Sequence, residues 1–213
     1  MHFLNDLEER GWALVPGISS SAELLELAKS IGSPTPSPSG ELVKKIGVIS
    51  EADAAPDTLS ATFGTKSFPL HTDTAFWAIP ARYLILRVRG DTRRHTTVLP
   101  FQRVFQGGGQ ALELAERSVW LLRTPSISAY CPMGFSVGQS RGWRYDRQCM
   151  FPVNHAAHEL VEALGPLEEH GFLEQVNWSP GDAVVISNWK VLHGRGAEPV
   201  QERERVLERI YVG

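Results

Sequence analysis

The hydrophobic pattern of the chain changes at about residue 42. Before that point, apolar residues recur at the three- to four-residue spacing of amphipathic helices, over residues 2–10 and 21–31. Ser20 or Ser21 can cap the second helix. The following stretch, Gly32–Gly40, is rich in Pro and Ser and predicts a surface loop. Residues 1–40 are therefore expected to form a helical cap followed by a loop.

Beyond residue 42, the apolar residues fall in short segments separated by turn residues. Several segments alternate between two faces, as in Tyr83, Ile85 and Arg87 against Leu84, Leu86 and Val88. Two helices interrupt them, at Gln110–Leu122 and Ala156–Glu169. The predicted strands are Val43–Ile49, Phe68–His71, Arg82–Val88, Thr96–Leu99, Ser126–Tyr130, Trp143–Tyr145, Ala183–Ser187 and Arg205–Val212.

Many short strands with few helices favour a mainly β fold with flanking helices, a sandwich or jelly roll. The chain has 213 residues, of which 42% are hydrophobic and 21% charged, and it shows no internal repeat. This composition fits a globular protein with one sizeable core. We expect a single domain over residues 1–213, with the core in residues 41–213.

The charge and the cysteines exclude several classes of protein. A net charge of -3 argues against a general nucleic-acid binder. The one basic run, Arg87 to His95, favours a solvated hairpin end over a phosphate-binding patch. Cys131 and Cys149 form no CxxC pair, and we expect two inert or buried thiols. The first residues lack the features of a signal peptide, and no apolar run is long enough to cross a bilayer. These features predict a soluble cytoplasmic protein without a membrane partner.

Three residues offer a candidate metal site. In His71-Thr72-Asp73, the first and third side chains would share one face of a strand and could bind one ion, with a polar strand end as the alternative. Much later, a buried strand Ala183–Ser187 is broken at Asn188-Trp189, and His193 precedes the turn residue Gly194. Two imidazoles and one carboxylate leave one face of iron(II) open to other ligands and O₂.

The last predicted strand carries two arginines on one face. Arg205, Leu207, Arg209 and Tyr211 alternate with the opposite face. An inward guanidinium can bind a carboxylate through two parallel hydrogen bonds. A solvated strand face is the alternative.

The order of these segments resembles the taurine dioxygenase / clavaminate synthase-like superfamily of Fe(II)/2-oxoglutarate oxygenases. The resemblance runs from about Gly64 to Val212. It implies a double-stranded β-helix (jelly-roll) core with iron bound by His71, Asp73 and His193. In addition, Arg205 matches the arginine that binds the distal carboxylate of 2-oxoglutarate.

The resemblance extends to further residues around the metal. Thr97 matches an assisting threonine, with Thr96 as the competitor after a shift of one residue. Arg209 matches an arginine that faces the substrate in several members. Arg144, in a segment that lines the pocket in relatives, could contact substrate or pair with Asp146. Trp77 could wall the pocket or pack in the core.

The resemblance implies an enzyme that uses iron(II), 2-oxoglutarate and O₂, releases succinate and CO₂, and hydroxylates a small polar or anionic substrate. Because Asp73 occupies the position that is a small residue in related halogenases, hydroxylation is favoured over halogenation. The alternatives are a cupin-like metal enzyme that does not use 2-oxoglutarate and a non-catalytic jelly-roll binding module. The sequence indicates neither the substrate nor the oligomeric state.

Overall fold

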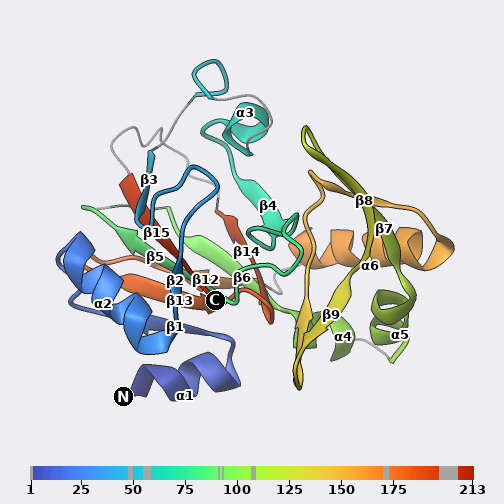
Figure 1. Cartoon of the computed structure of the whole chain (residues 1–213), viewed down its shortest axis with the longest axis horizontal. Coiled ribbons are helices and arrows are strands. Elements are labelled where there is room, and N and C mark those ends of the chain that lie inside the picture. Colours follow the sequence, from blue (N-terminus) through green and yellow to red (C-terminus); the bar gives the residue numbers. More distant parts are fainter. Residues whose placement is uncertain are drawn as a thin grey trace.

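Two antiparallel sheets form the centre of the computed structural model (Figure 1). The structure describes residues 2–47, 50–54, 59–90, 92, 94–106, 109–169, 173–196 and 206–213. The first sheet has the order β1-β13-β5-β15-β2, with β3 also paired to β15, and the second has the order β12-β6-β14-β4. The strands of the first sheet are β1 (Trp12–Val15), β2 (Pro34–Thr35), β3 (Lys44–Gly47), β5 (Tyr83–Val88), β13 (Ala183–Ser187) and β15 (Val206–Val212). Those of the second are β4 (Phe68–His71), β6 (Thr96–Pro100), β12 (Glu174–Val176) and β14 (Val191–Arg195).

Helices and two smaller sheets lie outside this pair. The smaller sheets are β11-β7-β8 and the hairpin β9-β10. Their strands are β7 (Val119–Thr124), β8 (Ile127–Pro132), β9 (Gly134–Val137), β10 (Ser140–Trp143) and β11 (Met150–Pro152). The helices are α1 (His2–Glu9), α2 (Ser21–Ile31), α3 (Leu59–Phe63), α4 (Phe101–Gln106), α5 (Gly109–Arg117) and α6 (His155–Glu169).

Three apolar clusters show how these layers pack. Inward residues of both sheets, such as Leu84 and Val98, form the cluster between them. The outer face of the first sheet packs against α1 and α2 through residues such as Ile85 and Leu24. The outer face of the second sheet packs against α4–α6 and β7 through residues such as Leu99. Each sheet is therefore buried on both faces, which is the layered arrangement of a jelly roll.

The N-terminal segment contributes more than the expected cap and loop. Ser20 caps α2 as predicted, because its side chain accepts a hydrogen bond from the Glu23 amide. However, β1 pairs along β13, and β2 lies within the stretch predicted as loop and pairs with the end of β15. Residues 12–15 and 34–35 thus extend the first sheet itself.

Two predicted elements are wrong. The helix predicted over Gln110–Leu122 ends at Arg117, where the Ser118 hydroxyl donates to the Ala115 carbonyl, and β7 begins at Val119. The β-branched and aromatic residues that follow favour a strand that packs against α6 and β11. The strand predicted over Trp143–Tyr145 is displaced, because β10 ends at Trp143.

The expectation of a solvated basic run is also wrong for part of that run. Arg87 is 5% exposed, and its Nη2 lies 2.8 Å from Glu208, itself buried in β15. Arg94 is 1% exposed, whereas Arg89 is exposed as expected. Arg93, the remaining arginine of the run, lies outside the described residues.

The two cysteines are free: Cys131 is partly buried and Cys149 is buried. Burial raises the pKa of both thiols, so both stay protonated near neutral pH. Among the described residues, no helix combines the length and apolar character needed to span a membrane.

Candidate metal centre

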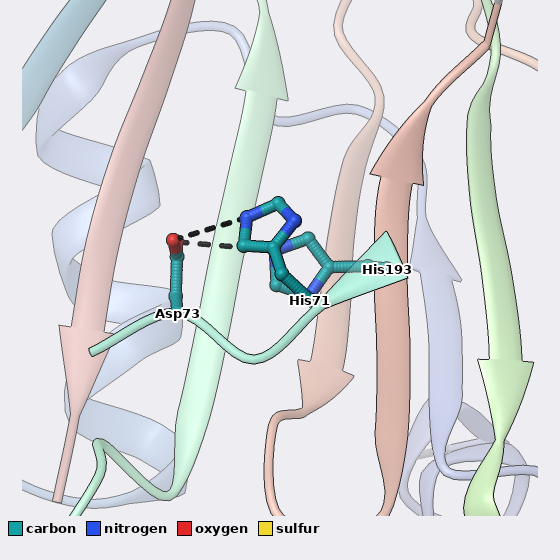
Figure 2. A group of neighbouring side chains, drawn as sticks. All are labelled: His71, Asp73 and His193. Carbon is teal, nitrogen blue, oxygen red and sulfur yellow. Dashed lines mark ion pairs between the residues drawn. The ribbon is translucent and has the colours of Figure 1, made fainter. Parts of the chain in front are cut away.

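Three side chains converge between the two sheets, beside the edge strand β4 of the second sheet (Figure 2). His71 is the last residue of β4, and its partner across the ladder is His193 in β14. Cross-strand partners project from the same face, and the two rings lie 4.5 Å apart between centroids. Asp73 completes the group: its Oδ1 is 3.5 Å from His71 Nε2 and its Oδ2 is 3.9 Å from His193 Nε2.

The backbone reaches this arrangement differently from the sequence-based expectation. Asp73 was expected to share a strand face with His71, but β4 ends at His71 and residues 73–76 form a turn. Thr74 has a φ of 57°, an unusual value for a β-branched residue. Likewise, His193 lies inside β14 rather than at its end. The carboxylate is therefore directed by a strained turn and not by strand alternation.

The three candidate ligands are buried and oriented as metal ligands. Their exposed fractions are 5%, 8% and 5%, and one ligand atom of each lies within 4.8 Å of the others. His71 Nδ1 is 3.0 Å from the Pro69 carbonyl, to which it donates as Nδ1–H. When the ring is neutral, that tautomer leaves a lone pair on Nε2, the nitrogen that faces Asp73 and would bind a metal ion. His193 Nδ1 is buried and has no hydrogen-bond partner among the described residues.

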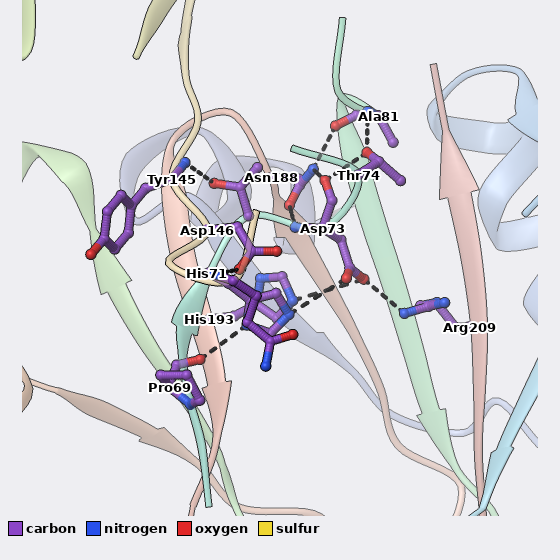
Figure 3. A network of polar contacts seen from close by, with 12 residues as sticks. Pro69, His71, Asp73, Thr74, Ala81, Tyr145, Asp146, Asn188, His193 and Arg209 are labelled. Atoms are coloured by element: carbon purple, nitrogen blue, oxygen red, sulfur yellow. Dashed lines mark hydrogen bonds and ion pairs between the residues drawn. The ribbon is translucent and has the colours of Figure 1, made fainter. Parts of the chain in front are cut away.

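Asn188 holds the Asp73 backbone in place (Figure 3). Its Oδ1 accepts from the Asp73 amide at 3.0 Å, and its Nδ2 donates to the Asp73 carbonyl at 2.9 Å. The same Nδ2 also donates to the Ala81 carbonyl at 2.8 Å. Asn188 is completely buried, in the turn between β13 and β14. One amide thus fixes Asp73 relative to the strand that carries His193.

The charges around the carboxylate keep it ionised. Burial alone would raise the pKa of Asp73, but Arg209, whose Nη1 is 3.1 Å from Oδ2, and the two imidazoles hold it well below its usual range. Burial, together with the charge of His71, lowers the pKa of His193 to about 3. For His71, burial is outweighed by the contact with Asp73, which raises its pKa. A carboxylate and a neutral imidazole are forms that bind a divalent metal ion.

An arginine outside the triad fixes the segment that follows Asp73. Arg144 is 5% exposed, and its Nη1 and Nη2 donate to the main-chain carbonyls of Ala75, Trp77 and Ala78 at 2.8–3.1 Å. These bonds take the place of the expected pair with Asp146. Arg144 therefore stabilises the connection between β4 and β5, and its suggested contact with substrate stays a prediction.

An aromatic wall lies beside Asp73. The rings of Trp77 and Tyr211 meet edge to face with centroids 5.7 Å apart. The guanidinium carbon of Arg209 lies 4.7 Å from the centroid of the Tyr211 ring. As predicted, Leu207, Arg209 and Tyr211 share one face of β15, which is the face toward the second sheet. Arg205 lies outside the described residues.

The two candidate threonines point to opposite faces of β6. Val98 is the ladder partner of His193, and Thr96 is the partner of Arg195. Thr96 and Val98 therefore project from the face of the second sheet that carries His193, which we call the metal face. Thr97 is the partner of Gly194 on the other face, where a Cβ on Gly194 would lie 2.9 Å from the Thr97 Oγ1. Both threonines are buried.

Sequence reasoning missed Asn188 and Tyr211 as parts of this site. Asn188 was noted as the residue that breaks a buried strand. A polar amide directly after five buried apolar residues was the available signal, because a buried amide must find hydrogen-bond partners. Tyr211 was placed on the correct face, but its distance from Trp77 in the sequence concealed the contact between the two rings.

Comparisons with known proteins identify the fold. No protein-family model matches the chain, and no curated protein matches it by sequence. Solved structures do match over almost the whole chain.

An asparagine oxygenase in complex with Fe(II), 2S,3S-3-hydroxyasparagine and succinate is 16% identical, with a TM-score of 0.76 over 99% of this chain and 77% of that one. The non-haem iron oxygenase OrfP, in complex with Fe and alpha-ketoglutaric acid, is 17% identical, with a TM-score of 0.75 over 99% and 78%. PvcB from Pseudomonas aeruginosa is 18% identical, with a TM-score of 0.72 over 99% and 79%. The chain therefore has the fold of these enzymes, which confirms the mainly β, jelly-roll prediction.

Proposed function

We propose that this protein is a mononuclear iron(II)- and 2-oxoglutarate-dependent oxygenase that hydroxylates a small polar or anionic substrate. The observation that carries the proposal is the convergence of His71, Asp73 and His193, all buried, with their ligand atoms within 4.8 Å of one another. Two imidazoles and one carboxylate on one face are the ligand set of non-haem iron(II) oxygenases. The solved structures of similar fold include iron oxygenases with succinate or 2-oxoglutarate.

The residues of this chain fit the ion that the proposal requires. The tautomer of His71 set by Pro69 presents Nε2 to a metal, and Arg209 keeps Asp73 ionised. His71, Asp73 and His193 would hold iron(II). When bound, iron(II) with 2-oxoglutarate and O₂ supplies the oxidation of a C–H bond, with succinate and CO₂ as by-products. The protein's part is to orient the ligands, to bind the carboxylates and to exclude water.

Four further residues have proposed roles in binding 2-oxoglutarate or the substrate. By resemblance, Arg205 would bind the distal carboxylate of 2-oxoglutarate. The β6 register favours Thr96 over Thr97 as the assisting threonine, because Thr96 shares the face of His193. The bond from Arg209 to Asp73 and the contact between the rings of Trp77 and Tyr211 support a role for Arg209 and Trp77 in contacting the substrate. Since the similar structures contain hydroxylated asparagine and arginine, free amino acids are the first substrates to test.

The test is anaerobic addition of iron(II) and then 2-oxoglutarate, followed by visible spectroscopy for the weak charge-transfer band of the chelate. His71→Ala, Asp73→Ala and His193→Ala should each abolish stoichiometric iron binding while the protein remains folded. Iron binding without the band would favour a cupin-like metal enzyme that does not use 2-oxoglutarate. Full iron affinity in all three variants would show that the site is misassigned. A cytoplasmic location and the absence of a nucleic-acid partner stay predictions.

A further inference from the structure

Arg94 is a buried arginine with unpaired guanidinium nitrogens. It is 1% exposed, and neither Nε nor Nη1 has a hydrogen-bond partner among the described residues. The main-chain amide of Arg94, by contrast, donates to Thr92 Oγ1 at 3.1 Å. No carboxylate in the described part of the chain forms an ion pair with this guanidinium. Burying an uncompensated charge is costly, so an anion is the group that this position lacks.

The other buried arginines show that this is not a general property of the fold. Arg87 is paired with Glu208 through two contacts of 2.8–2.9 Å. Arg144 donates to three main-chain carbonyls. Arg209 is bonded to Asp73. Nε of Arg144 and Nε of Arg209 are also unpaired among the described residues, but the other ends of both guanidinium groups are bonded within the protein. Arg94 differs because two of its nitrogens, Nε and Nη1, are unpaired in the ranges that the structure describes, and no bond of its guanidinium to another described residue is seen.

The strand geometry directs Arg94 toward the candidate metal centre. The β6–β14 ladder continues one residue beyond the strand, because the Gly196 amide donates to the His95 carbonyl at 3.1 Å. Within that ladder, Val98 pairs with His193 and Thr96 pairs with Arg195. Alternation therefore places Arg94 on the same face as Thr96 and Val98, the face that carries the metal ligands. Its burial agrees with this inward direction.

We propose that Arg94 is an anion-binding residue of this site and that it binds the distal carboxylate of 2-oxoglutarate together with Thr96. This inference rests on the proposed function, and it adds a second guanidinium for the carboxylate that the resemblance assigns to Arg205. Val98 lies opposite His193, and Thr96 and Arg94 lie successively farther from His193 toward the start of β6. Each residue of a strand adds about 3.3 Å, so the three side chains form a row that leads away from the candidate metal ligands. A dicarboxylate held by one end at the three candidate ligands would have its other carboxylate farther from them, where Thr96 and Arg94 would bind it. The planar guanidinium fork matches that carboxylate.

The test compares two 2-oxoacids on iron(II)-loaded protein by anaerobic calorimetry. 2-Oxoglutarate carries the distal carboxylate, and 2-oxobutyrate lacks it. Arg94→Met should weaken 2-oxoglutarate binding by roughly 30-fold or more, the effect of truncating one partner of a buried charge pair. Binding of 2-oxobutyrate should be unchanged. The matched control is Arg89→Ala, which removes an exposed charge from the same basic run and should alter neither affinity.

Thermal unfolding separates ligand binding from a structural role. Without ligand, Arg94→Met should melt at a higher temperature than the wild type, because an apolar side chain replaces an uncompensated buried charge. Added 2-oxoglutarate should raise the melting temperature of the wild type and have little effect on the variant. A variant that melts lower and binds 2-oxoglutarate as tightly as the wild type would overturn the inference. A wild type that binds iron(II) but no 2-oxoglutarate would instead overturn the proposed function, and with it the ligand assigned to Arg94.

Discussion

At the scale of single residues, the position of the Asp73 carboxylate depends on Asn188. Three of the backbone groups around the turn, the Asp73 amide and the carbonyls of Asp73 and Ala81, bond to this one side chain. Asn188→Ala would leave the Asp73 amide and the Ala81 carbonyl without the partner they have in the wild type, whereas the Asp73 carbonyl would keep the Thr74 hydroxyl as a donor. Each unsatisfied group costs about 1–3 kcal/mol, so we expect a loss of roughly 2 kcal/mol or more in the free energy of unfolding. We also expect weaker iron binding, measured by anaerobic metal titration.

A matched control distinguishes the two effects of Asn188. Asn154 also bridges main-chain groups, since it accepts from Val119 and donates to the Arg117 carbonyl, but it lies at the start of α6. Asn154→Ala should lower stability and leave the iron affinity of the folded protein intact. Equal iron affinities in the two variants would show that Asn188 supports the fold only.

Thr96 and Thr97 lie on opposite faces of β6, so replacing each of them should affect 2-oxoglutarate binding differently. Thr96→Val keeps the shape of the side chain but removes the hydroxyl from the metal face. A hydrogen bond to a charged group contributes about 1.5–3 kcal/mol, so the dissociation constant of 2-oxoglutarate should rise by roughly tenfold or more. Thr97→Val should have little effect, because its hydroxyl faces Gly194. A larger effect at Thr97 would support the direct sequence match and contradict the register argument.

Residue chemistry explains which parts of the site the sequence could predict. His71, Asp73 and His193 were identifiable because few residue types bind iron, and because their order along the chain resembles a known family. The turn that directs Asp73 was not predictable, because Thr74 adopts a conformation that its residue type disfavours. Arg94 was taken for part of a solvated run because its sequence neighbours are polar and burial depends on tertiary packing.

At the scale of elements, Glu174 in β12 joins three parts of the fold. Its Oε2 accepts from Arg10 at 2.9 Å and from the Trp12 indole at 3.0 Å, and its Oε1 is 2.5 Å from Arg103 in α4. Burial would raise the pKa of Glu174, but these donors outweigh it and lower the pKa below the usual 4.5. A folded-state pKa below the unfolded value contributes stability above the unfolded pKa, and this stability is lost as the pH falls through the folded pKa.

Glu174→Gln should therefore destabilise the protein at pH 7 by about 1 kcal/mol, the scale of a partly exposed charged network. The difference from the wild type should shrink as the pH falls below the usual 4.5. Urea unfolding at a series of pH values measures it. Glu26→Gln is the control, because its pair with Lys29 is exposed and should contribute little at any pH. A pH-independent difference at Glu174 would mean that packing, not charge, is responsible.

The elements themselves were predicted unevenly, for physical reasons. β4 and β13 were predicted with the bounds that the structure gives them, because both are short apolar segments flanked by turn residues. β14 was missed because the strand contains His193 and Gly194, neither of which favours a strand. Ladder bonds to β6 and β4 on both sides determine its conformation. β7 was assigned to a helix because four consecutive apolar residues fit either period.

At the scale of the whole molecule, the two sheets enclose the candidate site, and the segment that follows Asp73 beside it is short. The connection from β4 to β5, all of whose residues the structure describes, contains no helix or strand between His71 and Tyr83. Arg144 and Asn188 hold this connection through main-chain carbonyls. We expect a fixed wall rather than a segment that closes over the substrate, because its carbonyls are already bonded to buried side chains.

This architecture predicts imperfect sealing against water. Iron-loaded protein with 2-oxoglutarate and air should consume 2-oxoglutarate slowly even without substrate, because a closing segment normally excludes water and couples the two half-reactions. An amino acid that is a substrate should accelerate succinate formation, and the amount of succinate should then equal the amount of hydroxylated product.

The proposed reaction type gives a further expectation. Because the Asp73 carboxylate would fill the position that a halide needs, added chloride should leave the product unchanged. Mass spectrometry of reactions over a panel of amino acids and small organic acids, with and without chloride, measures the 2-oxoglutarate consumed, the succinate formed and the identity of the product. A chlorinated product, or the absence of succinate from iron-loaded protein under every condition, would contradict the proposed oxygenase.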